Sequence, residues 1–354
     1  MSPIQNPALP EGSLILVTGV NGFIGSHVAD QILLAGYRVR GTVRNAQKNA
    51  WMTTFFDDRY GKDKFELVEL KDLAEAKALE NALQGAYGVV HTASDVSFGP
   101  DPNKVVTPTI KYGLDIIKTA ANVPTVKRFV YTSSSTAATL PYPDKEFTIE
   151  HDSWNEPAVK QAWAPAPYEQ TRAYAVYAAS KTQTEQALWK FVKEEKPGFV
   201  FNTVLPDTTL GPALCPEHQG NPSTAALVAQ LAKANREEFE AMISFLQPQY
   251  HVDVRDIARL HVIALLNPDV KSERIFGFAD PFSYNEMLAI FRKNIPQKTF
   301  QEDWPNLGKT RCTIAPKARA IELLKSFGRK DGFMTFEQSV MDNLREHKLI
   351  DEMT

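Results

Sequence analysis

The chain has 354 residues with 39 basic and 42 acidic side chains, giving a formal net charge of −3. This length supplies enough interior for one large domain or two modest ones. The charge balance argues against nucleic acid or an anionic membrane as a partner. The two cysteines, Cys215 and Cys312, stand far apart, and the seven histidines lack metal-binding spacing, so we expect neither a disulfide framework nor a metal site.

The first residues lack the basic and apolar pattern of a leader, and the sequence contains no uninterrupted apolar run of about 18 residues. We therefore expect a soluble cytoplasmic protein that is a monomer or a homodimer and acts on a small molecule.

Short β-branched runs alternate with longer helical patterns from residue 14 onward, which indicates βαβ units that build a parallel sheet. Six strands are predicted, at residues 14–18, 38–43, 65–69, 88–91, 128–132 and 199–206. The expected fold class is α/β, with a Rossmann-type doubly wound parallel sheet over residues 10–209.

A glycine-rich turn follows the first predicted strand and precedes a helical pattern at residues 27–34. In this position Gly19 permits a tight turn, Gly22 lets backbone amides approach a pyrophosphate, and Gly25 allows close packing of the helix. The strand-turn-helix context predicts dinucleotide binding. The residues expected to contact the cofactor here are Thr18, Gly19, Asn21, Gly22, Phe23, Ile24 and Gly25.

The second predicted strand has no acidic residue at its end to bind a ribose 2′-hydroxyl. It runs into Arg44, with Lys48 one turn further, and a guanidinium there suits a 2′-phosphate. The cofactor pair predicted is therefore NADPH/NADP+. After the third strand, Asp72 and Leu73 are expected near the adenine. After the fourth strand, Thr92, Ala93 and Ser94 are expected near the ribose and pyrophosphate.

A serine cluster follows the fifth strand, and 43 residues after Ser134 comes Tyr177, with Lys181 four residues further on. On a helix Tyr177 and Lys181 share a face, so we expect the ammonium to lower the pKa of the phenol. Tyr177 would then protonate a carbonyl oxygen that Ser134 also binds. Either Ser133 or Ser134 can supply the hydroxyl, and we prefer Ser134. Thr132, Tyr177 and Lys181 join the predicted cofactor contacts, with Lys181 expected to hold the nicotinamide ribose.

Proline-rich residues 140–170 form a predicted surface insert that borders the active site. From residue 210 to 354 the pattern changes to helices, such as 224–239 and 284–294, and short strands such as 274–278. This part is predicted to be a smaller, mostly helical C-terminal substrate-binding lobe, with residues 250–268 returning to the Rossmann domain.

The glycine loop, the serine after the fifth strand and the Tyr-x-x-x-Lys pair occur in the order typical of extended short-chain dehydrogenase/reductases, which the chain resembles. The segments at residues 14–27, 126–134 and 177–182 are most similar to the dihydroflavonol-reductase-like branch, and within it to fungal and yeast NADPH-dependent aldehyde and ketone reductases. The likeness covers residues 9–267 and becomes thin after residue 281.

The resemblance implies NADPH-dependent reduction of aldehydes or ketones to alcohols, an oxidoreductase activity of the carbonyl-reductase class. It places Pro206, Thr208 and Thr209 along the cofactor. It also places Phe98, Tyr174, Leu246 and Gln249 around the substrate.

Two other functions fit parts of the same pattern. An NAD-retaining sugar-nucleotide epimerase or dehydratase has the same glycine loop and Tyr-Lys pair, although Arg44 argues against it. A non-catalytic NADPH-binding regulator could keep the fold without the chemistry.

Overall fold

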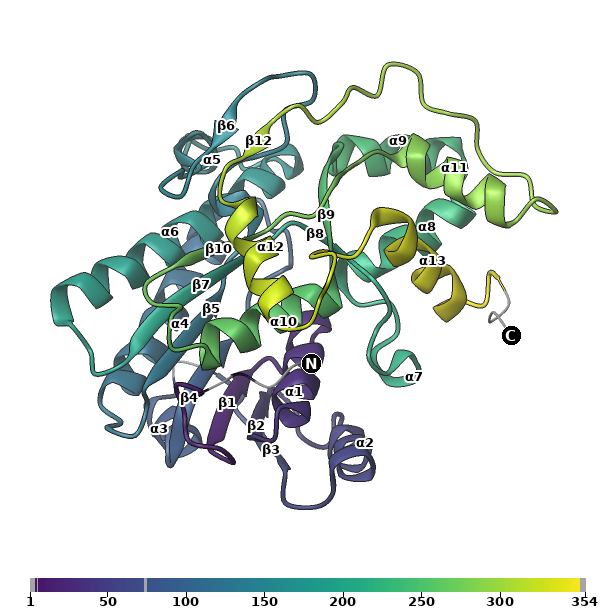
Figure 1. The fold of residues 1–354 in the computed structure, drawn as a ribbon. Helices are drawn as coiled ribbons and strands as arrows, with labels where there is room; N and C mark the ends of the chain where they lie inside the picture. Colours follow the sequence, from purple (N-terminus) through teal and green to yellow (C-terminus); the bar gives the residue numbers. More distant parts are fainter. Residues whose placement is uncertain (1–3, 5, 73–74, 351–354) are drawn as a thin grey trace.

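A central sheet of seven parallel strands organises the chain in the computed structural model, which describes residues 4, 6–72 and 75–350 (Figure 1). Its strand order is β10-β7-β5-β4-β1-β2-β3, the doubly wound order of a Rossmann sheet extended by one strand. The strands are β1 (Leu14–Thr18), β2 (Arg38–Val43), β3 (Phe65–Glu69), β4 (Ala86–His91), β5 (Arg128–Thr132), β7 (Val200–Pro206) and β10 (Arg274–Gly277). The predicted fold class is confirmed.

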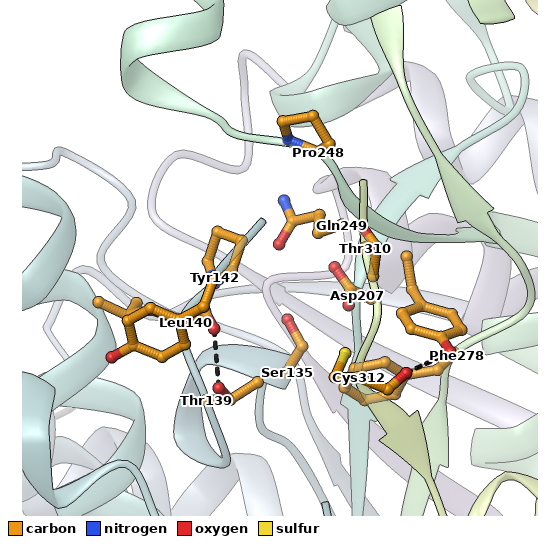
Figure 2. Close-up of a pocket in the computed structure, with 12 residues that line it drawn as sticks. Ser135, Thr139, Leu140, Tyr142, Asp207, Pro248, Gln249, Phe278, Thr310 and Cys312 are labelled. Atoms are coloured by element: carbon orange, nitrogen blue, oxygen red, sulfur yellow. Dashed lines mark hydrogen bonds between the residues drawn. The ribbon is translucent and has the colours of Figure 1, made fainter. Parts of the chain in front are cut away.

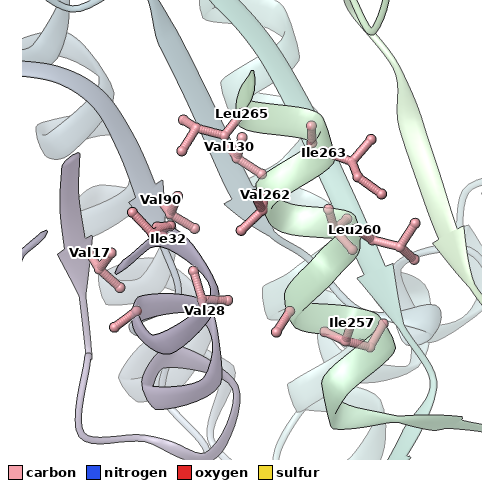
Figure 3. Packing of buried hydrophobic residues seen from close by; sticks show 14 of the residues in the cluster. Val17, Val28, Ile32, Val90, Val130, Ile257, Leu260, Val262, Ile263 and Leu265 are labelled. Carbon is pink, nitrogen blue, oxygen red and sulfur yellow. The ribbon is translucent and has the colours of Figure 1, made fainter. Parts of the chain in front are cut away.

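Helices cover both faces of this sheet, because successive side chains of a strand point to opposite faces. In β1, Ile15 and Val17 belong to one buried cluster and Leu16 to the other. The first face is covered by α1 (Phe23–Leu34), α2 (Trp51–Tyr60), α10 (Val254–Leu266) and α12 (Lys317–Ser326), and the second by α3 (Ala76–Leu83), α4 (Pro102–Ala121) and α6 (Ala173–Glu195). Figure 3 shows α1 and α10 side chains packed over the strands.

The residues after 210 differ from the prediction in two ways. The strand predicted at 274–278 is β10, which pairs with β7 as the edge of the central sheet and is not part of a separate lobe. The helix predicted at 224–239 is divided into a 3₁₀ turn (Ser223–Ala225), α8 (Ala226–Lys233) and α9 (Arg236–Phe245). The division occurs because Asn235 accepts from the Glu238 amide and starts a new helix with a capping box.

Most of the remaining C-terminal elements form a smaller cluster beside the sheet, at the upper right of Figure 1. They are β8 (Thr208–Leu210), β9 (Gln249–Asp253), β11 (Pro281–Phe282), α11 (Tyr284–Asn294) and α13 (Phe336–Glu346), with α8 and α9. The short helix α7 (Pro216–Gln219) lies lower in the figure, apart from this cluster. Strands β8 and β9 pair in parallel, and β11 adds to β9 in antiparallel orientation. Aromatic residues such as Phe239, Tyr284 and Phe291 fill the centre of this cluster.

The proline-rich insert contains more regular structure than its sequence predicts. It holds β6 (Thr148–Ile149) and α5 (Glu156–Ala162), with one 3₁₀ turn before it (Ser135–Ala137) and another at its end (Gln170–Arg172). Strand β6 pairs in parallel with β12 (Thr313–Ile314), so a late segment of the chain holds the insert in place.

Within the described residues no helix is long and apolar enough to cross a membrane, and no cluster of His, Cys, Asp or Glu could hold a metal.

Candidate active site

The predicted site residues gather where the parallel strands end. The glycine loop follows β1, the Thr92 segment follows β4, the serine cluster follows β5, and Asp207 follows β7. Because the carboxyl ends of parallel strands meet at one edge, these four segments become neighbours there, in the crevice where such sheets bind ligands.

The glycine loop has the geometry that its sequence predicts. Gly19 adopts φ +63°, and a Cβ there would lie 3.0 Å from Ala93 Cα. The Gly22 amide donates to the Gly19 carbonyl at 3.0 Å, and Gly22 caps the start of α1. A Cβ on Gly25 would lie 2.7 Å from Thr92 Oγ1. The turn therefore depends on the absence of side chains at these positions.

Hydrogen bonds join the end of β1 to the segment after β4. Thr92 Oγ1 donates to the Thr18 carbonyl at 2.6 Å, and the Ala93 amide donates to Thr18 Oγ1 at 3.2 Å. Within the described part of the chain, Ser94 Oγ is buried without a hydrogen-bond partner. A buried hydroxyl without a partner beside a glycine loop fits a polar ligand such as the ribose and pyrophosphate of a dinucleotide.

The other predicted cofactor contacts lie around this loop. Arg44 and Lys48 are exposed just beyond the end of β2. Asn21 is exposed, Phe23 is buried and Ile24 is half-buried at the start of α1. Asp72 is exposed after β3, and Leu73 lies outside the described residues. Pro206 ends β7, while Thr208 and Thr209 belong to β8, where Thr209 Oγ1 donates to the Asp207 carbonyl at 2.9 Å.

The structure brings Ser134, Tyr177 and Lys181 together. The Ser134 hydroxyl hydrogen-bonds the phenol of Tyr177, and it accepts from the Thr136 amide and hydroxyl at 3.2 and 3.0 Å. Lys181 is buried, and its Nζ donates to the Thr132 carbonyl at 3.2 Å. Helix α6 thus presents a phenol and an amine one turn apart to the end of β5.

Ser133 has a different environment. Its Oγ donates to Glu185 Oε2 at 2.6 Å, and Glu185 lies on α6 one turn after Lys181. Glu185 is fully buried and also accepts from Thr203 Oγ1 and from Arg274 Nε, each at 2.8 Å. This arrangement favours Ser134 as the hydroxyl that faces a substrate.

The electrostatics differ from the expectation for Tyr177. Burial raises the pKa of the Tyr177 phenol above its ordinary value, and the hydrogen bond from Ser134 opposes that rise. The net shift is therefore opposite to the expected lowering of the Tyr177 pKa, because desolvation of the phenolate dominates. Burial also lowers the pKa of Lys181 to about 8, which the nearby Glu185 carboxylate opposes.

An aromatic group borders Tyr177 on the side of the C-terminal lobe. The ring of Phe98 lies 4.9 Å from that of Tyr177 and 5.0 Å from that of Phe245. Phe98 adopts φ +51°, a backbone conformation that is strained for a bulky residue and that is found most often at functional sites. Phe245 is 46% exposed, so apolar surface remains open beside the phenol.

The other predicted substrate contacts lie on the same side. The hydroxyl of Tyr174 hydrogen-bonds the side chain of Gln249, whose Nε2 donates to Thr208 Oγ1 at 2.7 Å. Leu246 is buried at the end of α9, where its carbonyl accepts from the Tyr284 hydroxyl at 2.9 Å.

A small cavity of about 20 Å³ adjoins these residues, and sequence reasoning did not identify most of its wall (Figure 2). Gln249 forms one side and Ser135 another, and the carboxyl group of Asp207 lies between them. Residues of the insert and of the segment before β12, such as Tyr142 and Cys312, complete the wall. The position of Asp207 directly after the β7 strand was the available signal, because polar side chains at strand ends face the ligand edge.

Comparisons with known proteins agree with this architecture. The model of the NAD dependent epimerase/dehydratase family matches residues 15–277. Aldehyde reductase 2 of Sporidiobolus salmonicolor is 41% identical over 345 residues, covering 97% of this chain and 98% of that protein. The NAD-dependent epimerase/dehydratase terH of Aspergillus terreus is 40% identical over 338 residues, covering 96% of this chain and 98% of that protein.

Among solved structures, Gre2 from Candida albicans in complex with NADPH is similar with a TM-score of 0.80 and 23% identity, covering 96% of this chain and 100% of that chain. At this identity the likeness establishes the fold alone. The family match and the two relatives show that the chain is an extended short-chain dehydrogenase/reductase. It belongs to the NAD dependent epimerase/dehydratase family.

Proposed function

We propose that this protein reduces aldehydes or ketones to alcohols with NADPH. The observation that carries the proposal is the hydrogen-bonded pair of Ser134 and Tyr177 beside the buried Lys181, at the strand ends next to the glycine loop. The names of close relatives support it, since aldehyde reductase 2 of Sporidiobolus salmonicolor is similar along nearly its whole length.

The residues present fit a dinucleotide. The glycine loop and the unpartnered Ser94 hydroxyl would hold the pyrophosphate and ribose, and Arg44 would pair with a 2′-phosphate. When bound, NADPH supplies the hydride that reduces the carbonyl carbon.

The side chains of the protein would supply the proton and hold the carbonyl oxygen. Because burial keeps the pKa of Tyr177 above its ordinary value, the phenol carries its proton at neutral pH and can donate it to the oxygen as negative charge develops there. Ser134 would donate a second hydrogen bond to that oxygen. The Lys181 ammonium, held at the Thr132 carbonyl, would contribute positive charge nearby.

Tyr177→Phe tests this mechanism. We expect kcat for NADPH-dependent carbonyl reduction to fall by about 100-fold or more, because general acid catalysis contributes that much, while NADPH still binds. A screen of aldehydes, β-keto esters and α-diketones first identifies a reporter substrate. Tyr112→Phe, a half-buried tyrosine on α4, is the matched control. A fully active Tyr177→Phe enzyme would contradict the mechanism.

The same preparation distinguishes the alternatives. A reductase exchanges its cofactor at each turnover, whereas an epimerase copurifies with NAD that dilution does not remove. Stoichiometric NADPH binding with no oxidation by any carbonyl compound would instead indicate a regulator. The cytoplasmic location and the monomeric or dimeric state stay predictions.

A further inference from the structure

We propose that Asp207 is a specificity-determining residue that binds a hydrogen-bond donor, a hydroxyl or ammonium group, carried by the carbonyl substrate at a distance from its reacting carbon. This inference rests on the proposed function and adds a substrate class to it. No role in the proposed chemistry requires a carboxyl group at this position.

The position of Asp207 is unusual for a carboxyl group. The residue is 8% exposed, and its side chain forms part of the cavity wall beside Ser135 (Figure 2). Its Oδ1 accepts from the Thr208 amide at 2.7 Å, and its carboxyl group also accepts from the Ser135 hydroxyl and the Tyr250 amide. These donors are all neutral. Buried carboxylates are ordinarily paired with a cation.

The surroundings supply no such cation. Among the described residues that line the cavity there is no lysine, arginine or histidine. The titratable groups that act on Asp207 are Tyr174 on α6, Tyr250 on β9 and Cys312 before β12, and each of them is neutral or negative. Lys317 Nζ lies 5.8 Å from the centre of the Tyr250 ring and is directed to the Ala279 carbonyl and Asp280. Arg311, next to Cys312 in the chain, pairs with Asp144 and Glu146. Asp207 can therefore accept a hydrogen bond from a ligand in the cavity.

The cavity lies next to the reacting groups. Ser135 follows Ser134 directly, so their Cα atoms are about 3.8 Å apart, and Ser134 hydrogen-bonds Tyr177. On the other side Gln249 lines the cavity and hydrogen-bonds Tyr174, one turn before Tyr177 on α6. A substrate whose carbonyl oxygen reaches Tyr177 can thus extend a second group to Asp207.

The wall around the carboxyl is mostly apolar, with Leu140, Pro248 and Phe278 among its residues. Burial raises the pKa of Asp207 to about 7, against the lowering effect of its hydrogen bonds from Thr208 and Ser135. A carboxyl group held in this way discriminates between substrates, because a substrate that offers only a methyl group adds no hydrogen bond to it and still displaces water from the cavity.

Matched sets of three ketones test the proposal. Each set has one skeleton and one remote substituent, a methyl, a hydroxyl or an ammonium group, and the sets differ in the distance of that substituent from the carbonyl. In at least one set we expect the wild-type kcat/KM to favour the hydroxyl or ammonium ketone over the methyl ketone by about ten- to hundredfold.

Two variants separate charge from hydrogen bonding. Asp207→Asn should remove the preference for ammonium and keep part of any preference for hydroxyl, and Asp207→Leu should remove both and favour methyl. Asp152→Asn, which changes an exposed carboxylate of the insert, is the matched control and should keep the wild-type ratios. Retention of NADPH binding verifies that each variant is folded.

The outcomes are distinguishable. If the wild-type enzyme reduces the methyl ketones but the ratios are equal in wild type, Asp207→Asn and Asp207→Leu in every set, the proposal for Asp207 is overturned and the reductase function stands. If wild-type protein reduces none of the ketones and none of the screened carbonyl compounds, the proposed function fails and this inference fails with it.

Discussion

At the active site, two neighbouring serines form hydrogen bonds with different side chains. Ser134 Oγ meets the phenol of Tyr177, while Ser133 Oγ donates to the buried Glu185. The sequence alone could not separate them, since consecutive hydroxyls have the same chemistry. Their surroundings separate them, because only one lies on the side of the active site.

Replacing each serine by alanine should affect a different property, catalysis for Ser134 and stability for Ser133. Ser134→Ala should lower kcat by about 100-fold or more, since it removes a donor to the developing oxyanion. Ser133→Ala should reduce the free energy of unfolding by about 1–3 kcal/mol, since it removes a hydrogen bond from a buried carboxylate. Steady-state kinetics and urea unfolding measure the two effects; a reversed pattern would exchange the roles.

The Asp207 carboxyl makes stability depend on pH. Its pKa is raised by burial from 3.8 to about 7, so the folded state holds this proton more tightly than the unfolded state. The resulting stabilisation is fully present below pH 3.8 and is lost as pH rises through about 7. Asp207→Asn should therefore gain stability relative to wild type between these values, by up to roughly 4 kcal/mol, and the difference should level off above.

Melting temperatures of both proteins without cofactor, measured from pH 4.5 to 8.5, check this dependence. The contributions of the other titrating groups to the pH dependence cancel in the comparison, because both proteins contain the same groups. A difference that is constant with pH would show that the carboxyl does not titrate in this range.

At the level of elements, strand β2 has an arginine at each end with different surroundings. Arg38 begins the strand, and its Nε donates to the Gly12 carbonyl at 3.1 Å, away from the ligand edge. Arg44 follows the carboxyl end, where the register of β1 and β2 pairs Thr18 with Thr42 and places the glycine loop alongside. Only the second position can reach a bound dinucleotide.

Arg44→Glu should raise KM for NADPH by about tenfold or more and change KM for NADH little, because a bidentate bond to the 2′-phosphate is replaced by repulsion. Arg38→Glu, with the same charge change on the same strand, is the control and should leave both constants near the wild-type values. Equal effects of Arg44→Glu on the two cofactors would contradict the assignment of Arg44.

Across the whole molecule, the strands of the central sheet followed from the sequence, because most are short apolar runs between turn signals; β2 and β3 carry charged residues among their apolar ones. Strand β10 was also expected, but its place was not, since four residues do not show which sheet edge they join. The cavity wall around Asp207 was missed for a similar reason. It combines residues separated by more than 100 positions, such as Ser135 and Cys312, and only tertiary packing brings them together.

The C-terminal segment returns to the sheet, so the parts of the molecule should unfold together. Helix α10 packs its buried face against Val130 and Val204, and β10 pairs with β7. In urea we expect a single transition, with coincident midpoints for far-ultraviolet circular dichroism and for the fluorescence of Trp51 and Trp304 measured in single-tryptophan variants. Separate midpoints would show that the lobe unfolds independently.

The chain leaves the sheet for the smaller lobe, returns to the sheet through α10 and β10, and leaves again. This path limits how substrate specificity could be transferred between relatives. A single crossover near residue 210 would join the first six strands of one parent to the seventh strand and the covering helix of another. A chimera that transfers substrate preference would need junctions on both sides of α10 and β10, leaving the seven-stranded framework from one parent.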